Sequence, residues 1–370
     1  MVHIRSLLGG GPISEDKERI AEAFKKRGVS EVIWNITNEC NLKCRHCYVD
    51  AGLERPSNEL SKEEAIRLAN EIGELGVPLL FLTGGEPFLR KDLFDVLSVI
   101  KDYDVKVVLS TGGHVLNREA IKKIAKYRIR YLAVPIYGPE EFHDIYVGVK
   151  GAFNKVVEAV EMAKKEGIEV CVKTLIAKET LRYARYVIEI SKQLGSKIVY
   201  LCDLINVGRA SRKYHERVER VEWRRLASYM LEEALSNEDM EFDIGAHPSL
   251  APYIVKKLEE IGCNTDKVLK RLKTRSVCPV GRGLIAINAS GDFLPCNFIQ
   301  EFKVGNFRNM SLREAANVLS ELGSRDKLKG KCGSCTYRDI CGGCRAKAYV
   351  YYKDIMAEDP SCVMYRDEIR

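Results

Sequence analysis

Up to about residue 206, short hydrophobic runs alternate with longer amphipathic segments. Six runs rich in β-branched and aromatic residues predict strands at 31–37, 79–83, 105–110, 131–137, 169–176 and 197–205. Helical spacing of hydrophobic positions predicts helices between them, at about 61–75, 91–102, 117–127, 152–166 and 179–194. Such alternation favours parallel strands joined by right-handed crossovers. Because a clear seventh unit is missing, we predict an α/β fold built on a partial (β/α)6 TIM-like barrel.

The alternation stops after residue 206. Charged sequence of helical character follows, and a cysteine-rich tail begins at Cys278. A chain of 370 residues is also long for one hydrophobic core, so we expect a large domain with a smaller appendage. The predicted parts are an N-terminal helical extension (1–30), the barrel (31–206), a helical connecting region (207–277) and a C-terminal cysteine-rich domain (278–370).

Composition places the chain among folded globular proteins. Hydrophobic residues make up 46% and charged residues 30%, which excludes a disordered or fibrous chain. No hydrophobic run approaches the roughly 20 residues needed to cross a bilayer, and residues 1–12 hold too short an apolar stretch for a secretory signal. We therefore expect a cytoplasmic protein. The sequence contains only two glutamines, Gln193 and Gln300, whereas Lys and Glu are abundant, and this bias is typical of thermophiles.

Thirteen cysteines in a cytoplasmic protein are better explained as metal ligands or catalytic thiols than as disulfides, with heat-loving organisms as the exception. Three of them, Cys40, Cys44 and Cys47, have the spacing C-x3-C-x2-C. Three thiolates can bind three irons of a 4Fe-4S cluster and leave the fourth iron open to an exogenous ligand. A structural zinc site, or a closed cluster completed by a distant cysteine, is the alternative.

These cysteines follow the first predicted strand, and other unusual residues follow the later strands. Thr-Gly-Gly-Glu-Pro (83–87) follows the second strand and Ser-Thr-Gly-Gly (110–113) the third, while residues 136–138 and 173–178 end the fourth and fifth. The carboxyl ends of parallel strands lie at one edge of such a fold. We therefore expect a single site there, with glycines that allow a small-molecule cosubstrate to approach closely.

The segment Cys-Asn-Leu-Lys-Cys-Arg-His-Cys (40–47), together with Thr-Gly-Gly-Glu-Pro, resembles the radical S-adenosylmethionine (SAM) superfamily over residues 30–206. The resemblance implies a 4Fe-4S cluster, bound by Cys40, Cys44 and Cys47, whose unique iron is chelated by SAM. Reduction of that cluster would cleave SAM to methionine and a 5′-deoxyadenosyl radical, which removes a hydrogen atom from the substrate. The implied SAM contacts are Gly84, Gly85 and Glu86 for the methionine amino group, His46 near the adenine, Ser110 and Thr111 for the ribose or a carboxylate, and Lys173 for the SAM carboxylate.

The cysteine-rich tail, with the spacing C-x2-C-x5-C-x2-C at its centre, resembles the SPASM extension of radical SAM enzymes. A pair of zinc ribbons is the alternative. The resemblance implies two auxiliary 4Fe-4S clusters, of which the first is one thiolate short. Its fourth ligand would be a non-cysteine side chain, Cys263 or the substrate. The implied ligands are Cys278, Cys296 and Cys344 for the first cluster, and Cys332, Cys335, Cys341 and Cys362 for the second.

Several side chains outside these motifs are assigned simpler roles. At 135–138 the fourth strand ends in Pro-Ile-Tyr-Gly, where the family often has Ser, a hydrophobic residue, Asp and Gly. Tyr137 and His143 could transfer protons, with a packed or surface role as the alternative, and His247 is interpreted as structural. Buried packing is expected for the three remaining cysteines, Cys171, Cys202 and Cys263.

The net charge of +7 has a local component. Residues 267–282 carry six basic side chains and no acidic one, and Arg209, Arg212 and Lys213 follow the sixth strand. A solvated helix face is one explanation, and a site for an acidic substrate is the other, with Arg209, Arg212 and Arg282 as candidates to hold carboxylates. Nucleic-acid binding lacks the expected interleaving of aromatic and basic residues.

Residues 335–365 resemble the ends of SPASM enzymes that modify tetrapyrroles in haem-type cofactor synthesis. The predicted function is therefore a radical SAM oxidoreductase or maturase that acts on an acidic tetrapyrrole with a low-potential electron donor such as ferredoxin or flavodoxin. Peptide-modifying enzymes and maturases of metal cofactors share much of this tail and are the alternative. A non-catalytic iron–sulfur carrier or zinc-stabilised binding module is less favoured, because neither needs a SAM pocket around Glu86.

Overall fold

The computed structural model describes residues 1–212 and 217–365. One sheet forms its centre, with the strand order β1-β8-β7-β6-β5-β4-β3-β2-β9-β10-β11. The six predicted strands are present, and each pairs in parallel with the next. They are β2 (Glu31–Thr37), β3 (Leu79–Gly84), β4 (Lys106–Ser110), β5 (Ile129–Pro135), β6 (Val170–Ile176) and β7 (Ile198–Asp203).

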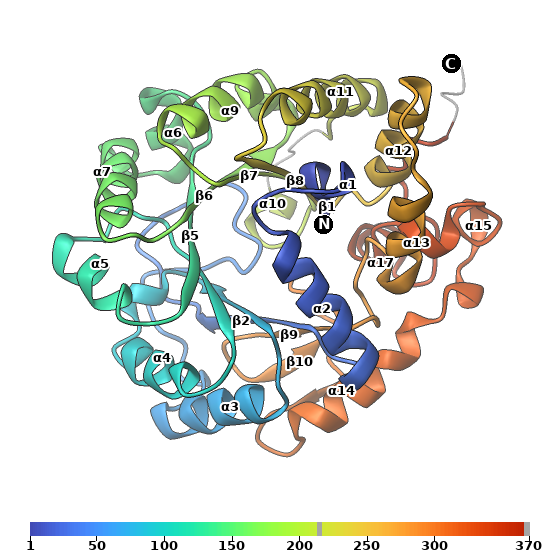
Figure 1. Ribbon diagram of the computed structural model, residues 1–370. Coiled ribbons are helices and arrows are strands. Elements are labelled where there is room, and N and C mark those ends of the chain that lie inside the picture. Colours follow the sequence, from blue (N-terminus) through green and yellow to red (C-terminus); the bar gives the residue numbers. More distant parts are fainter. Residues whose placement is uncertain (213–216, 366–370) are drawn as a thin grey trace.

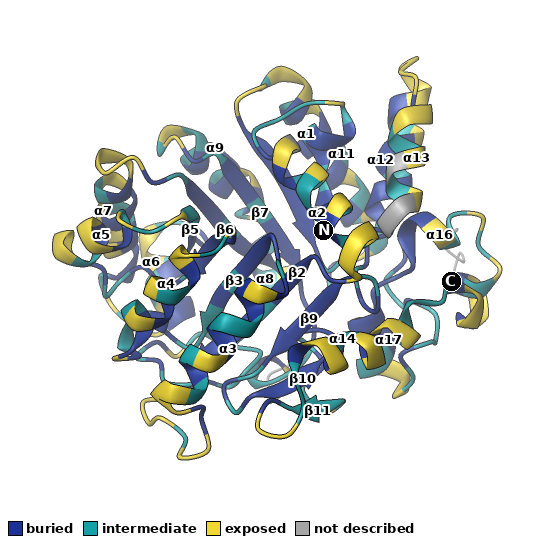
Figure 2. Cartoon of the chain, turned by 60° about the horizontal axis from the view of Figure 1, so that its bottom comes forward, coloured by how far each residue is buried: buried dark blue, intermediate teal, exposed yellow. Residues whose placement is uncertain are grey.

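Helices connect these strands and surround the sheet (Figure 1). In α3, Ser61 accepts a hydrogen bond from the Glu64 N–H at 3.2 Å and so begins the helix, while Leu68 and Ile72 are buried. Figure 2 shows that the strands are buried and that the outer faces of the helices are exposed. The predicted helices are α3 (Lys62–Glu74), α4 (Leu93–Lys101), α5 (Arg118–Ile124), α7 (Ala152–Lys165) and α9 (Ala184–Gln193), and α6 (Glu140–Val147), α8 (Lys178–Leu181) and the 3-10 turn Pro87–Leu89 are additional.

The predicted partial barrel is confirmed, and two further parallel strands extend its row, one of them inside the connecting region that was expected to be helical. Strand β8 (Glu241–Gly245) pairs in parallel with β7, and β9 (Leu284–Ile287) pairs in parallel with β2. In the described residues the row does not close, because β8 and β9 are each followed by another strand rather than by each other. The helices of the connecting region are α10 (Arg209–Arg212), α11 (Arg220–Ser236), α12 (Leu250–Glu260) and α13 (Asp266–Arg275).

The N-terminal segment closes the amino end of the barrel. Strand β1 (Val2–His3), which the prediction of a helical extension missed, pairs antiparallel with β8 and leads into α1 (Ile4–Leu7) and α2 (Ser14–Arg27). Ile20 of α2 packs with inward-facing residues of β3, β4, β5, β6 and β7. Helix α2 covers this end, and the carboxyl ends of the strands, where the loops with the candidate residues begin, lie at the opposite edge.

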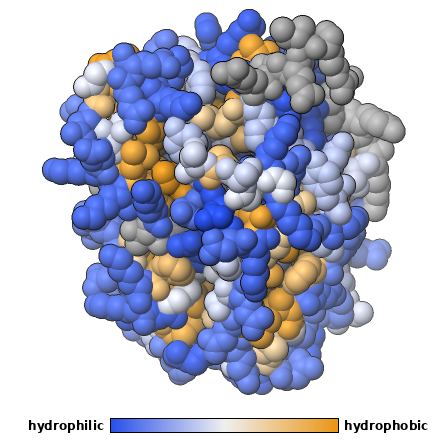
Figure 3. Space-filling view, turned by 90° about the vertical axis from the view of Figure 1, so that its right-hand side faces the viewer, coloured by the Kyte–Doolittle hydropathy of each residue, from blue (hydrophilic) through white to orange (hydrophobic). Residues whose placement is uncertain are grey.

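The remaining residues, orange to red in Figure 1, lie along the lower and right-hand sides of the barrel in that view. The right-hand side is mostly hydrophilic, with separate hydrophobic patches (Figure 3). Within the described ranges, no helix is both long and apolar enough to cross a membrane. The elements of this part are β10 (Asp292–Leu294), β11 (Gly305–Asn306), α14 (Leu312–Ser320), α15 (Gly330–Gly333), α16 (Arg338–Cys341) and α17 (Arg345–Tyr352), with 3-10 turns at Glu321–Gly323 and Arg325–Lys327.

Candidate active site

Residues 38–52, which follow β2 and are called here the cysteine loop, carry the first three cysteines. Cys40 is buried, and Cys44 and Cys47 are partly buried in the same apolar cluster. Burial raises the pKa of Cys40 to about 11 and that of Cys44 to about 12, and a neighbouring thiol of the loop adds to each shift. Thiols that influence one another in this way lie close together, and their ionisation needs a compensating positive charge such as bound iron.

The donor set, three free thiols in one apolar cluster, fits a 4Fe-4S cluster. Over residues 1–212 and 217–365, no three His, Cys, Asp or Glu side chains converge tightly enough to hold one metal ion. A 4Fe-4S cluster binds its thiolates at separate irons, so it does not require such convergence. The geometry of the cysteine loop is therefore compatible with a cluster.

Arg209 holds the cysteine loop against the end of β7. Its Nε donates to the carbonyl of Cys44 at 3.0 Å, its Nη1 donates to the carbonyl of Ala51 at 2.8 Å, and its backbone N–H donates to the carbonyl of Cys47 at 2.9 Å. A Cβ atom at Gly208 would lie only 2.4 Å from the same Cys47 carbonyl. The structure therefore corrects the prediction that Arg209 binds substrate carboxylates, because its guanidinium is occupied by the loop.

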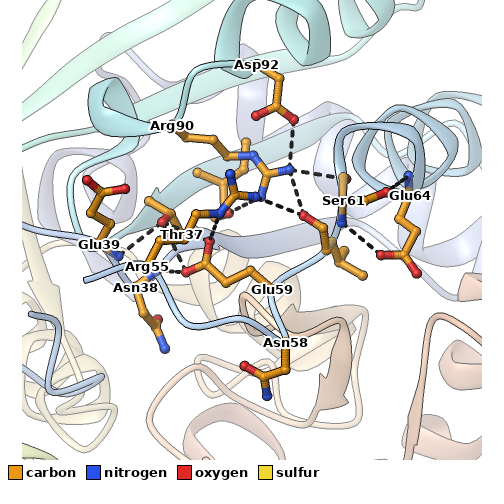
Figure 4. A network of polar contacts seen from close by, with 12 residues as sticks. Thr37, Asn38, Glu39, Arg55, Asn58, Glu59, Ser61, Glu64, Arg90 and Asp92 are labelled. Carbon is orange, nitrogen blue, oxygen red and sulfur yellow. Dashed lines mark hydrogen bonds and ion pairs between the residues drawn. The ribbon is translucent and has the colours of Figure 1, made fainter. Parts of the chain in front are cut away.

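A buried carboxylate fixes the base of the cysteine loop (Figure 4). Glu59 accepts hydrogen bonds from Oγ1 of Thr37 at 3.0 Å, from the N–H of Asn38 at 2.5 Å and from Nε of Arg55 at 2.9 Å. These contacts join the last residue of β2 to the segment that precedes α3. Such charge-assisted hydrogen bonds are stronger than neutral ones, so they restrict the direction in which the loop leaves the strand.

A buried guanidinium completes this support (Figure 4). Arg90 donates to the carbonyl of Ile36 at 2.7 Å, to the carbonyl of Leu60 at 3.0 Å and to Asp92 at 2.8 Å. It therefore links β2, the start of α3 and the segment after β3. Neither Glu59 nor Arg90 could be identified from the sequence. Glu59 stands just before the capping serine of α3 and Arg90 just before the start of α4, and charged residues at such positions are typical of ordinary helix starts.

Gly84 and Gly85 are required by the backbone itself. A Cβ at Gly84 would lie 2.3 Å from the carbonyl oxygen of Thr37, and one at Gly85 would lie 2.1 Å from that of Glu39. The N–H groups of Gly85 and Glu86 donate to these two carbonyls, both at 2.7 Å. The ends of β2 and β3 thus approach too closely for any other residue.

Glu86 joins the ends of β3 and β4. Its buried carboxylate accepts hydrogen bonds from Oγ1 of Thr111 at 2.8 Å, from the N–H of Gly112 at 2.8 Å and from the N–H of Phe88 at 3.2 Å. Burial raises the pKa of Glu86, while these hydrogen bonds and the charge of Lys173 oppose the rise. The predicted contacts Glu86 and Thr111 are therefore brought together.

Lys173 reaches across the barrel interior from β6. Its Nζ donates to Oγ of Ser110 at the end of β4. Burial lowers the pKa of Lys173, and the carboxylate of Glu86 opposes this shift. Both Lys173 and Ser110, which are predicted to contact SAM, line the central cavity.

An aromatic wall surrounds His46. Its ring stacks on Tyr146, with centroids 5.2 Å apart, and its Nε2 lies 2.9 Å from the hydroxyl of Tyr137. His143 is buried behind Tyr137, accepts that residue's backbone N–H at 3.4 Å, and has its pKa lowered to about 4 by burial. The end of β5 thus contributes an aromatic surface where the family pattern has polar residues.

Three cysteines of the tail, called here the first tail group, pack in one apolar cluster: Cys278, Cys296 and Cys344. Burial raises the pKa of Cys296 to about 12, and Cys278 and Cys202 add to the shift. Cys202, on β7, is buried as expected. The first tail group therefore lies beside the end of a barrel strand.

The second tail group consists of Cys332, Cys335, Cys341 and Cys362, from α15, the following turn, α16 and the segment after α17. Burial raises the pKa of Cys341 well above its usual value, and the thiols of Cys362 and Cys332 add to it. Cys263 belongs to neither group: it is exposed between α12 and α13. Its predicted burial is therefore wrong, whereas Cys171 packs inside the barrel as expected.

A cavity of about 430 Å³ extends from the cysteine loop to the first tail group. His46, Ser110 and Lys173 line it near the cysteine loop. All three members of the first tail group also line it. A substrate in this cavity would lie between two groups of cysteines.

The basic side chains on the described cavity wall are lysines and histidines rather than arginines. Lys17 of α2 and Lys173 of β6 are its lysines. Arg282 does not line it, and the side chain of Arg212 and the whole of Lys213 lie outside the described residues. The predicted arginine lining is therefore not present in the described wall.

This combination defines a class of iron–sulfur enzyme that binds a small cosubstrate at the mouth of an open barrel. The model of the radical SAM superfamily matches residues 34–185, and that of the iron–sulfur cluster-binding SPASM domain matches residues 278–345. The chain belongs to the radical SAM superfamily and carries a C-terminal SPASM domain. Its cofactors are 4Fe-4S clusters and SAM.

Two relatives from Methanosarcina barkeri are similar over nearly the whole chain. AdoMet-dependent heme synthase is 29% identical, with 90% of this chain and 95% of that protein covered. Fe-coproporphyrin III synthase is also 29% identical, with 94% and 90% covered. Among solved structures, Streptococcus suis SuiB bound to its precursor peptide SuiA has a TM-score of 0.73 at 16% identity, covering 95% of this chain and 80% of SuiB. That likeness confirms the fold.

Proposed function

We propose that this radical SAM enzyme acts on an acidic tetrapyrrole in the synthesis of a haem-type cofactor, where it oxidises or removes carboxylate-bearing side chains. The cavity carries this proposal, because it connects His46, Ser110 and Lys173, three of the expected SAM contacts, to the first tail group. Similarity over 90% of this chain to a haem synthase supports the substrate class. Electrons would come from a low-potential donor such as ferredoxin or flavodoxin.

We propose that each of the three cysteine groups binds one iron–sulfur cluster. When bound and reduced, the SAM-binding cluster and SAM supply hydrogen-abstraction chemistry. The cysteine loop would hold that cluster, and the two tail groups would hold auxiliary clusters, with the fourth ligand of the first tail group left open to substrate. The proposed ligands are Cys40, Cys44 and Cys47; Cys278, Cys296 and Cys344; and Cys332, Cys335, Cys341 and Cys362.

The surrounding side chains would then position SAM and substrate. Glu86 would accept the ammonium of SAM, and His46 would present its ring to the adenine. Lys173, held by Ser110, would donate to a carboxylate. Lys17, the other lysine of the described cavity wall, would hold a substrate carboxylate in place of the arginines that the sequence favoured.

Anaerobically reconstituted protein is expected to bind about twelve iron atoms per chain, as three four-iron clusters. The physical basis is the division of ten buried or partly buried cysteines into three groups. Iron and acid-labile sulfide analysis measures this number. About four irons per chain together with stoichiometric zinc would show that the tail groups do not bind auxiliary iron–sulfur clusters.

Addition of iron coproporphyrin III to the reconstituted enzyme is expected to shift the visible absorption of the porphyrin and to increase SAM cleavage severalfold. The cavity lysines should hold its carboxylates, so the methyl ester of the same porphyrin is the matched control and should bind more weakly. Spectral titration and 5′-deoxyadenosine analysis measure the two effects. If no tetrapyrrole binds or increases SAM cleavage, and a peptide encoded nearby does increase it, the enzyme belongs to the peptide-modifying group instead.

A further inference from the structure

A buried ion pair connects the SPASM domain to the barrel. The ammonium of Lys347, on α17, donates to Oδ2 of Asp203 at the end of β7 and to Oγ of Ser361 at 3.0 Å. The side chains of Lys347 and Asp203 are only 3% and 6% exposed. Burial alone would lower the pKa of Lys347, but Asp203 and Asp359 raise it above its usual value. The lysine therefore carries its charge inside the protein.

Asp359 extends this network to both tail groups. Its Oδ2 accepts the N–H of Cys344 at 2.7 Å, and its Oδ1 accepts the N–H and hydroxyl of Ser361 at 2.9 and 2.8 Å. Its own N–H donates to Sγ of Cys332 at 3.3 Å. One buried aspartate thus contacts a proposed ligand from each auxiliary cluster and shares Ser361 with Lys347.

The position of Lys347 gives its charge a direct influence on the first tail group. Cys344 is the N-cap of α17, and Lys347 follows it by three residues on the same helix. Charges in a buried environment are screened little by water and salt, so two groups about one helical turn apart interact strongly. Because reduction adds a negative charge to a cluster, a nearby ammonium favours the reduced form and a nearby carboxylate opposes it.

We propose that Lys347 is a positioning residue for the auxiliary cluster of Cys278, Cys296 and Cys344, whose reduction potential it raises, and that Asp203 limits this effect by pairing with it. The inference rests on the proposed ligands of that cluster and is independent of the substrate. It assigns the buried ion pair a role in accepting an electron, beyond that of joining two domains.

The two roles differ in the sign of their effects. If the ion pair only joins the domains, Lys347→Met and Asp203→Asn break the same contact and disturb the cluster in the same way. If the charges set the potential, Lys347→Met lowers it and Asp203→Asn raises it, since Asp359 still faces the lysine in the second variant. Opposite shifts are therefore specific to the electrostatic role.

The test is a redox titration of the anaerobically reconstituted enzyme, followed by electron paramagnetic resonance of the auxiliary clusters. Lys347→Met is expected to shift the reduction equilibrium of one auxiliary cluster at least tenfold toward the oxidised form, which is 59 mV for a one-electron couple. Asp203→Asn is expected to shift it in the opposite direction. Lys347→Arg keeps the charge and should remain near the wild-type value. Lys353→Met, at the exposed end of the same helix, is the matched control and should cause no shift.

The outcomes separate this inference from the ligand assignment on which it rests. Wild-type enzyme without a titratable auxiliary cluster would overturn the assignment. A wild-type signal whose potential is unchanged in Lys347→Met, or shifted equally by Lys353→Met, would overturn the role of Lys347. If Lys347→Met does not fold, a shift of Asp203→Asn toward lower potential would overturn it instead.

Discussion

Cys44→Ala is expected to abolish reductive cleavage of SAM. Changing an outer-shell partner of a metal site already costs about 10–100-fold, and removal of a direct ligand should cost more. Cys44 lies in the cysteine loop among thiols whose ionisation bound iron must compensate. Formation of 5′-deoxyadenosine under dithionite measures the reaction without any need for the substrate.

Two other cysteine variants serve as controls for this result. Cys335→Ala belongs to the second tail group and should retain uncoupled SAM cleavage while losing product formation. Cys171→Ala removes a buried thiol that packs inside the barrel, apart from all three groups, and should keep cluster iron. A wild-type rate of 5′-deoxyadenosine formation in Cys44→Ala would show that the cysteine loop is not the SAM-binding site.

Arg209→Lys is expected to lower SAM cleavage about tenfold in the absence of substrate, because a lysine cannot replace the planar guanidinium fork. Arg209 holds the carbonyls of Cys44 and Ala51 at the same time. A lysine would keep the charge and lose this two-point contact, so the loop should also bind less iron. Iron content and the rate of 5′-deoxyadenosine formation are measured on the same preparation.

The same variant distinguishes loop support from substrate binding. If Arg209 contacted substrate carboxylates, Arg209→Lys would weaken substrate binding and leave uncoupled cleavage unchanged. The matched control is Arg19→Lys, whose guanidinium on α2 donates to the carbonyl and the carboxylate of Asp104. Equal loss in both variants would mean that the effect is not specific to the cysteine loop.

The central strands could be predicted because both of their faces are buried, which leaves continuous hydrophobic runs in the sequence. Strand β8 could not, since its sequence Glu-Phe-Asp-Ile-Gly contains two acidic residues. Glu241 accepts the N–H groups of Arg5 and Ser6, and Asp243 pairs with His3. These partners lie more than 230 residues away, so a local pattern gives no sign that the carboxylates are satisfied inside a sheet.

The candidate site divides in the same way. The cysteine loop and the centre of the tail were visible because their cysteines are spaced a few residues apart. In the structure the thiols of Cys47 and Cys40 raise the pKa of Cys44, and those of Cys362 and Cys332 raise the pKa of Cys341. Arg209 and Lys347 act on partners about 150 residues away. From the sequence, a basic residue near the expected mouth of the barrel was interpreted as binding substrate. Only the folded chain shows that the guanidinium of Arg209 already donates to backbone carbonyl groups.

The close contact of β2 and β3 has an evolutionary consequence. Any side chain at Gly84 or Gly85 would collide with the carbonyls of Thr37 and Glu39, whether or not SAM is bound. Selection for folding alone would therefore preserve both glycines in a descendant that had lost its catalytic chemistry. In such a descendant the glycine pair would record ancestry, and the loss of the three loop cysteines would record the change of activity.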